Sequence, residues 1–368
     1  MEIKKWKDVL RIVSGKNQST VANPNGRYPI YGSGGLIGYA NDYLCEPGTT
    51  IIGRKGTINK PIFVSEPFWN IDTAFGLVPG ERLNKKYLYY FCQHFNFLPL
   101  DKSTGRPSLA KSDLLKIEMP IPPLSEQERI VSRIEELFSQ LDAGVETLKK
   151  VKTQLGAYRQ AVLKEAFSTF KEKKFVRELS TIVTSGSRGW AKYYSDNGAR
   201  FIRISDLTRN GINLVNSNIQ YVLLPDNVEG KRSRLQGGDV VVSITADLGS
   251  IALIPDDIQE SYINQHIAMI RFKKPNQGRF MAWYLRSEWG QTDLLKNKRG
   301  GGKLGLGLDD IRDTPVPIVS DEESERTCSI IDSRLSLCTN IVQTVDTLLA
   351  QSVGIRRGIL KRAFEGSL

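Results

Sequence analysis

The stretch PIPPLSEQERI, residues 120–130, decides the fold of this 368-residue chain. Ser125 and Glu128 have the S-x-x-E spacing of a helix-start capping box, with prolines just upstream. Apolar residues then recur at alternating spacings of four and three, which is the 3.5-residue period of a coiled-coil seam. The pattern predicts a helix over residues 126–168, about 64 Å long at 1.5 Å per residue. The predicted seam consists of Ile130, Ile134, Leu137, Leu141, Leu148, Val151 and Leu155.

A second stretch, PVPIVSDEESERT at residues 315–327, repeats this proline-rich joint. A constant offset of 197 carries Arg129 onto Arg326 and Phe167 onto Phe364. An isolated helix of this kind is marginal in water, so the first helix needs a partner, and the repeat supplies one. The second helix must run back along the first, which predicts an antiparallel intramolecular coiled coil. Its predicted seam residues are Ile331, Ile341, Val345, Leu348 and Ile355.

The two joints divide the chain into four parts: residues 1–124, helix 125–170, residues 171–319 and helix 320–368. Each non-helical block mixes short β-branched runs with amphipathic stretches, which is typical of an α+β domain. At an offset of 193, GRKGTI at residues 53–58 aligns with TADLGSI at residues 245–251. We therefore predict two similar globular domains, separated by the two long helices and related by pseudo-twofold symmetry.

The composition fits a soluble protein, with 40% hydrophobic and 25% charged residues. The N-terminal sequence has no apolar signal region and no apolar run is long enough to span a bilayer, so we expect a cytoplasmic protein without a membrane segment. The four cysteines form no CxxC pair and are expected to be reduced. The chain has only two histidines, His94 and His266, both expected in the core, so no metal site is predicted.

The positive charge is concentrated in the two blocks. The chain has a net charge of +11, of which residues 1–124 and 171–319 each contribute +6, whereas the helical segments contribute 0 and −1. This distribution predicts two separate anion-binding domains. Duplex DNA presents an equivalent face about every 34–36 Å, so it is the polyanion that two separated domains can contact together.

The sequence resembles the specificity subunits of type I restriction–modification enzymes, the HsdS family, over its whole length. The resemblance rests on residues 119–167, on their weaker repeat, and on three domain phrases. These phrases are YPIYGSGGLIGY (residues 28–39), RFIRISDL (residues 200–207) and GDVVVSITADLGS (residues 238–250). The sequence departs from the family pattern at the second joint, which has one proline fewer, and at Arg334 and Ser352 in the second seam.

The resemblance implies that each block is a target recognition domain for one half of a bipartite, asymmetric DNA site. It also implies that the helices space the two halves and dock two modification subunits, which methylate adenine at N6. Restriction subunits would join this complex. The chain itself is then expected to be non-catalytic and to bind no cofactor, because S-adenosylmethionine, ATP and Mg²⁺ belong to the partner subunits.

Basic loops are the predicted DNA contacts, because Lys and Arg bind phosphates and Arg also recognises guanine. Neighbouring Gly and Ser let the backbone approach a phosphate closely. Each loop taken alone could equally be a solvated surface loop. In block one the candidates are Arg54, Lys55, Lys102, Ser103 and Arg106. In block two they are Arg188, Lys192, Tyr193, Lys231, Arg232, Arg234, Lys298, Arg299 and Lys303.

Two other functions are left open by the sequence. The first is a DNA nuclease or methyltransferase that acts alone. PDNVEGK at residues 225–231 contains the Asp, Glu and Lys of a nuclease site, but its two acidic residues are only three positions apart. The sequence IPPL lacks the Asn of the Asn-Pro-Pro-aromatic motif that adenine methyltransferases use. The second is a coiled-coil adaptor for acidic proteins, which would bind without regard to duplex DNA.

Overall fold

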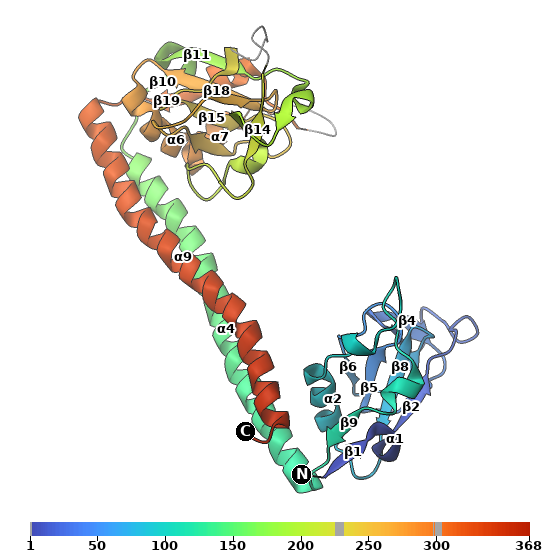
Figure 1. Ribbon diagram of the computed structural model, residues 1–368. Helices are drawn as coiled ribbons and strands as arrows, with labels where there is room; N and C mark the ends of the chain where they lie inside the picture. The colour runs from blue at the N-terminus through green and yellow to red at the C-terminus, as the bar shows by residue number, and fades with distance from the viewer. Residues whose placement is uncertain (1, 225–231, 297, 299–303) are drawn as a thin grey trace. The chain divides into compact units, whose positions relative to one another are not determined.

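The computed structural model describes residues 2–224, 232–296, 298 and 304–368 (Figure 1). It contains two compact units. Unit 1 comprises Met1–Lys149 and Val345–Leu368, and unit 2 comprises Lys150–Thr344. Each unit therefore includes one globular block together with part of both long helices, and each is described separately below.

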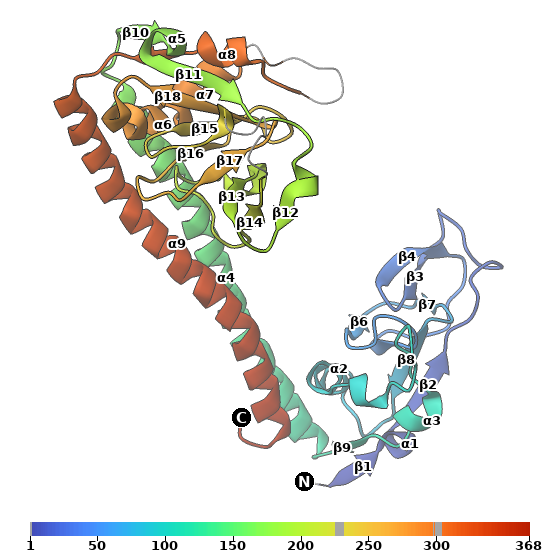
Figure 2. The ribbon, with the colours of Figure 1, turned by 45° about the horizontal axis from the view of Figure 1, so that its top comes forward.

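Unit 1 contains a four-stranded antiparallel sheet in the order β2-β8-β5-β6. A three-stranded sheet, β4-β3-β7, follows at one end, as Figure 2 shows, and β1 pairs with β9. The elements are β1 (Ile3–Lys5), α1 (Trp6–Val9), β2 (Leu10–Ser14), β3 (Tyr28–Gly32), β4 (Gly35–Ala40), β5 (Thr49–Gly53), β6 (Ile62–Val64), β7 (Trp69–Asn70), β8 (Ala74–Pro79), α2 (Lys85–His94), η1 (Leu98–Leu100), α3 (Lys111–Leu114) and β9 (Glu118–Pro120).

Unit 2 repeats this plan. Its sheets have the orders β11-β18-β15-β16, β12-β14-β13-β17 and β10-β19. The elements are β10 (Lys173–Phe175), α5 (Val176–Leu179), β11 (Ser180–Ser185), η2 (Trp190–Tyr193), β12 (Tyr194–Ser195), β13 (Ala199–Ile202), η3 (Ile204–Asp206), β14 (Gln220–Val222), β15 (Val240–Ser243), β16 (Ile251–Leu253), β17 (Ser261–Ile263), β18 (Ile267–Phe272), η5 (Pro275–Gln277), α6 (Gly278–Arg286), α7 (Glu288–Leu294), α8 (Leu308–Arg312) and β19 (Pro315–Pro317). The predicted α+β class with two similar domains is confirmed.

Each unit has its own apolar core, which lies between the four-stranded sheet and a helix rich in aromatic residues. This helix is α2 in unit 1 and α6 in unit 2. In unit 1 the Trp6 side chain is fully buried and packs edge-on against Phe97, with ring centroids 6.1 Å apart. In unit 2 Phe167 packs edge-on against Phe280 of α6, with centroids 5.3 Å apart. The four cysteines are free and buried. No helix in the described residues combines the length and apolarity needed to cross a membrane.

The two long helices are α4 (Leu124–Phe167) and α9 (Asp321–Phe364). In each unit their parts lie side by side and antiparallel (Figures 1 and 2). In unit 1 Arg356 of α9 pairs with Asp142 of α4. In unit 2 the Nη1 atom of Arg334 lies 2.7 Å from the Glu165 carboxylate. Later residues of one helix thus meet earlier residues of the other, as the sequence predicts.

The two joints start their helices differently. The predicted capping box at Ser125 is wrong, because α4 begins at Leu124 and places the exposed Ser125 inside the helix. The buried Gln127 fixes the joint instead, since its amide nitrogen donates to the Pro122 carbonyl (2.8 Å) and its amide oxygen accepts from Asn84 N (2.8 Å). At the second joint a capping box is present. Glu323 N donates to Ser320 Oγ (3.2 Å), and the Glu323 carboxylate accepts from Ser320 N (3.4 Å).

The predicted seam holds along α4 but only in part along α9. Ile130, Ile134, Ile331 and Val345 are buried, and Leu137, Leu141, Leu148, Val151 and Leu155 are half-buried. Three predicted seam residues are wrong: Ile341, Leu348 and Ile355 are 37%, 42% and 53% exposed. The prediction assumed that α9 buries the residues that lie 197 positions after the seam residues of α4. In the structure, at every second seam position of α9, the residue that faces α4 is one position later than this offset gives. One residue turns a helix by about 100°, which moves a side chain out of the seam. The buried positions are Cys328, Ile331, Leu335, Cys338 and Val345.

Because of this shift, two neighbouring substitutions in α9 should change the free energy of unfolding by different amounts. Val345→Ala removes two carbons from a side chain that is 4% exposed, so the free energy of unfolding should fall by about 1.5 kcal/mol. Leu348→Ala trims a side chain that is 42% exposed and should change it by less than about 0.5 kcal/mol. Urea unfolding of the isolated chain measures both. Equal losses would contradict the seam described here.

Candidate nucleic-acid interface

In both units the same four chain segments meet at one end of the four-stranded sheet. The backbone shows the equivalence. Arg54 N donates to the Thr73 carbonyl (2.8 Å) in unit 1, and Ile244 N donates to the His266 carbonyl (2.9 Å) in unit 2. Leu109 N donates to Arg54 O (2.8 Å), just as Leu306 N donates to Ile244 O (2.9 Å). We refer to these segments as the sheet-end loops: residues 14–17, 53–58, 70–74 and 101–109 in unit 1, and residues 185–188, 243–251, 263–267 and 304–306 in unit 2.

The strand register corrects the sequence alignment of the two blocks. Gly53 of β5 pairs with Ala74, and Ser243 of β15 pairs with Ile267. The offset at this point is therefore 190 and not 193, and Lys55 corresponds to Thr245. The offset is still 190 at β6 and β16, because Thr50 pairs with Phe63 and Val240 pairs with Leu253. It is 193 at β8 and β18, so the three additional residues of unit 2 lie between β16 and β18. The sequence alignment of residues 53–58 with residues 245–251 was therefore shifted by three residues, because it matched similar residues and not the strand register.

In unit 1 the two predicted basic segments lie together. Lys55 and Ser108 form an antiparallel bridge, and Gly56 N donates to the Pro107 carbonyl (2.7 Å). Gly56 has φ +86°, and a Cβ there would lie 2.8 Å from Nη2 of Arg106. The Arg106 guanidinium therefore rests on a position that only glycine suits. The structure thus brings together Arg54, Lys55 and Arg106, which the sequence proposed from two separate segments.

The loop of residues 101–108 is ordered by Asp101. Its carboxylate accepts hydrogen bonds from Ser103 Oγ (2.7 Å), Ser103 N (3.0 Å) and Ser108 N (3.0 Å). The Ser103 hydroxyl, followed by the two backbone amides, lowers the pKa of Asp101 below its usual range. Ser103 therefore holds the loop in shape, while the Lys102 side chain is 78% exposed and pairs at its tip with Asp113 (2.8 Å).

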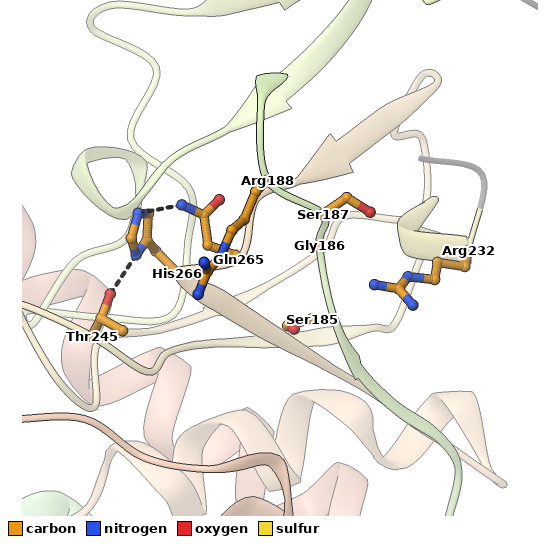
Figure 3. Close-up of a pocket in the computed structure, with 8 residues that line it drawn as sticks. All are labelled: Ser185, Gly186, Ser187, Arg188, Arg232, Thr245, Gln265 and His266. Atoms are coloured by element: carbon orange, nitrogen blue, oxygen red, sulfur yellow. Dashed lines mark hydrogen bonds between the residues drawn. The ribbon is translucent and has the colours of Figure 1, made fainter. Parts of the chain in front are cut away.

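In unit 2 three of the sheet-end loops, together with Arg232 from a separate segment, line an open, polar hollow of about 690 Å³ (Figure 3). Two of the predicted cations, Arg188 and Arg232, belong to it and come from different segments. In the view of Figure 3 the backbone of residues 185–187 passes between Arg232 and the pair Gln265 and His266. The lining residues are Ser185, Gly186, Ser187, Arg188, Arg232, Thr245, Gln265 and His266.

His266 is not a core residue, contrary to the expectation from the sequence. Its ring lines the hollow with Nδ1 2.7 Å from Thr245 Oγ1 and Nε2 2.7 Å from Gln265 Nε2. An amide nitrogen can only donate, so in the neutral ring Nε2 accepts and Nδ1 carries the hydrogen that Thr245 accepts. The histidine thereby fixes the Gln265 amide at the wall of the hollow. Glutamine is a side chain that recognises adenine edges.

The remaining predicted residues of unit 2 lie outside the lining of this hollow. Lys192 stacks on Tyr193, with Nζ 4.8 Å from the ring centroid. Arg234 is exposed, and its carbonyl accepts from Arg271 Nη2 (3.2 Å). Lys298 is exposed. The predicted contacts Lys231, Arg299 and Lys303 are outside the described residues.

Sequence reasoning missed Lys16, Thr245 and Gln265. Lys16 is exposed and follows Gly15, where a Cβ would lie 1.8 Å from the Ile71 carbonyl oxygen. Gly186 in unit 2 has the same close approach, 1.8 Å from the Ile263 oxygen. The sequence did contain a pattern that could have located Lys16. In both units a Ser-Gly pair ends the first long strand, and the loop that carries the candidate contacts begins at this pair.

The model of the family described as Type I restriction modification DNA specificity domain matches residues 1–155 and 171–349. The chain belongs to this family. The two matches fall one on each globular block, so the chain carries two DNA specificity domains. This membership favours a specificity subunit over a nuclease or methyltransferase that acts alone.

Curated relatives and solved structures agree with the family assignment. The EcoBI type I restriction enzyme specificity subunit of Escherichia coli is 23% identical over 357 residues, covering 89% of this chain and 75% of the relative. The MjaVIII specificity subunit of Methanocaldococcus jannaschii is 24% identical over 320 residues, covering 80% and 70%. Among structures, a chain from a study of assembly and conformational transition of the type I R-M system matches with TM-score 0.77 at 16% identity, covering 100% and 98%. The HsdS subunit from Thermoanaerobacter tengcongensis matches with TM-score 0.57 at 15% identity, covering 100% and 97%. The structural matches show a shared fold.

Proposed function

We propose that this chain is the specificity subunit of a type I restriction–modification complex and recognises a bipartite, asymmetric DNA site, one half with each unit. The observation that supports it is the duplicated set of sheet-end loops. Each set combines exposed basic side chains, in unit 2 Arg188 and the neighbouring Arg232, with hydrogen-bonding side chains, and each is built on a separate core. Cations supply phosphate contacts, and side-chain amides and guanidiniums supply base contacts. The two sets differ in sequence, which accounts for unlike half-sites.

We further propose that the helices carry two modification subunits and the restriction subunits. In support, α9 has a second apolar stripe besides the seam, and it includes Ile330, Leu337 and Ile341, which are 44%, 62% and 37% exposed. Exposed apolar side chains at helical spacing suit the apolar face of a partner helix. On this proposal the chain is non-catalytic, acts in the cytoplasm, and binds no cofactor. S-adenosylmethionine, ATP and Mg²⁺ would act on the partner subunits.

Incubating the purified chain with duplex DNA, Mg²⁺ and S-adenosylmethionine tests this proposal. The expected result is salt-dependent duplex binding with neither cleavage nor methylation, and product would support an enzyme that acts alone. Footprinting of the assembled complex should show two separated protected patches. A single contiguous patch would count against recognition of two half-sites. Binding that competitor duplex does not affect would favour the adaptor function.

Arg188→Ala in the hollow of unit 2 should weaken duplex binding. If Arg188 contacts a phosphate, the slope of log K against log salt should fall in magnitude by about 0.9, and if it contacts guanine, discrimination at one base should fall by about 1–3 kcal/mol. Titrations at several salt concentrations measure both quantities. Lys274→Ala is the matched control, because Lys274 lies just beyond the other end of β18 and pairs with Asp321 (3.1 Å). A loss equal to that of the control would argue against the hollow as a contact site.

A further inference from the structure

Two arginines at equivalent positions of the repeat cross between the long helices, but only one of them meets a carboxylate. The offset of 197 carries Arg159 onto Arg356 and Asp142 onto Thr339. In unit 1 Arg356 pairs with Asp142 and stacks on Phe138, with Cζ 4.2 Å from the ring centroid. In unit 2 Arg159 Nη2 donates instead to the Thr339 hydroxyl (2.9 Å). Arg159 therefore lacks the acid that neutralises its counterpart.

Two further arginines lie beside Arg159. Arg209 and Arg286 line with it a pocket of about 180 Å³ in unit 2. Arg286 is 9% exposed, and its guanidinium donates to the Arg209 backbone carbonyl. The Arg209 side chain binds Asp247, with Nε 2.9 Å from Oδ1. Within the described residues that line this pocket there is no acid, so three guanidiniums are balanced by one carboxylate.

The pocket has an excess of positive charge and a donor without an acceptor. The Nε atom of Arg159 is buried and has no hydrogen-bond partner in the described structure. Burial, followed by the nearby charge of Arg209, lowers the pKa of Arg286. At the position of Arg286, unit 1 has Gln93, whose amide donates to Tyr89 Oη (2.6 Å). A bound anion would supply both the missing charge and the missing acceptor.

We propose that unit 2 binds one small tetrahedral oxyanion, phosphate or sulfate, between Arg159, Arg209 and Arg286. Guanidiniums bind such ions through paired N–H donors. The pocket is below the roughly 300–1,000 Å³ of sites that hold drug-sized ligands, so it suits a single ion and excludes a nucleotide. The ion would join α4, the segment that carries Arg209, and α6. The proposal does not depend on sequence-specific DNA recognition.

Thermal unfolding of the full chain tests the proposal. Added phosphate or sulfate at roughly 10 mM should raise Tm by about 2–4 °C over chloride at the same ionic strength, which corresponds to an ion at about ten times its dissociation constant. Matched ionic strength separates a specific site from general screening. No rise over chloride would overturn the proposal.

Two substitutions in unit 2, each introducing the residue found at the equivalent position of unit 1, make this test more specific. Arg286→Gln installs the residue that unit 1 has, and Thr339→Asp supplies the carboxylate that faces Arg356 there. Both should abolish the oxyanion-dependent rise, and Thr339→Asp should remain as stable in chloride as the parent chain. Arg188→Ala is the control and should keep the full rise even where it loses DNA affinity. An equal rise in all variants would overturn the site.

The same arginine variant separates two sources of the oxyanion. If a free ion occupies the pocket, Arg286→Gln should leave duplex affinity unchanged. If a DNA backbone phosphate occupies it, Arg286→Gln should weaken duplex binding, and inorganic phosphate should compete with duplex only in the parent chain. Either result supports an oxyanion site, provided that the Tm rise seen in the parent chain is lost in Arg286→Gln and Thr339→Asp.

Discussion

Replacing Arg271 with leucine is expected to lower the free energy of unfolding of unit 2 by about 3–5 kcal/mol. Arg271 on β18 binds the Asp239 carboxylate through two hydrogen bonds, Nε to Oδ1 (2.8 Å) and Nη2 to Oδ2 (2.7 Å). The Asp239 side chain is 1% exposed. Without its partner a buried carboxylate loses most of the interactions that offset its desolvation. Hydrogen exchange of the β15 and β18 amides in the full chain measures unit 2 separately from unit 1.

Unit 1 provides the control for this prediction. The strand registers place Thr49 at the position of Asp239 and Val78 at the position of Arg271. The double substitution Asp239→Thr with Arg271→Val should therefore recover most of the loss, because removing both charges leaves neither of them unpaired. A double variant as unstable as Arg271→Leu would show that the loss comes from packing and not from the unpaired charge.

The sequence predicted the long helices and their antiparallel pairing because a heptad period is a property of consecutive residues. It did not predict which residues of α9 enter the seam. Ile341, Leu348 and Ile355 are as apolar as Val345. The offset of 197 aligned them with Gly144, Val151 and Tyr158, which occupy positions of the 3.5-residue period in α4. Burial depends on where the facing helix lies, which hydrophobicity alone does not encode. The same applies at the first joint, where the buried Gln127 depends on carbonyls brought to it by the fold.

The candidate site was predicted better in unit 1 than in unit 2. Arg54, Lys55 and Arg106 were found because charge and glycine mark them locally, and the fold then joined their segments. Gln265 and Thr245 were missed because an amide or a hydroxyl in a loop has no distinguishing pattern. His266 was assigned to the core from its apolar neighbours in sequence, whereas its ring lies at the edge between β17 and β18, where alternate residues face different environments.

Exchanging residues 1–124 for the matching block of another specificity subunit is expected to change one half of the DNA target completely and leave the other half as it was. The physical reason is that, in the described part of the chain, the main core of unit 1 is built from residues 6–138 and the last turns of α9, and its sheet-end loops come from residues 14–109. Specific sites are bound about 10³–10⁷ times more tightly than non-specific DNA, so the old half-site should lose methylation throughout the genome. Methylome sequencing of cells that express the chain with its partner subunits detects the change.

The design of this exchange depends on contacts between the block and the helices. Tyr87 packs on Phe364, with ring centroids 5.1 Å apart, and the Lys86 ammonium lies 2.5 Å from the Glu135 carboxylate. A donor block that lacks partners for Glu135 and Phe364 would lower the stability of unit 1 as well as change the target. Grafting only residues 53–58 and 101–109 keeps these contacts. It should change the DNA sequence that unit 1 recognises without lowering the stability of the unit. If both halves of the target change together, or if neither does, the two units do not recognise DNA independently. The proposal that each unit recognises one half-site would then be wrong.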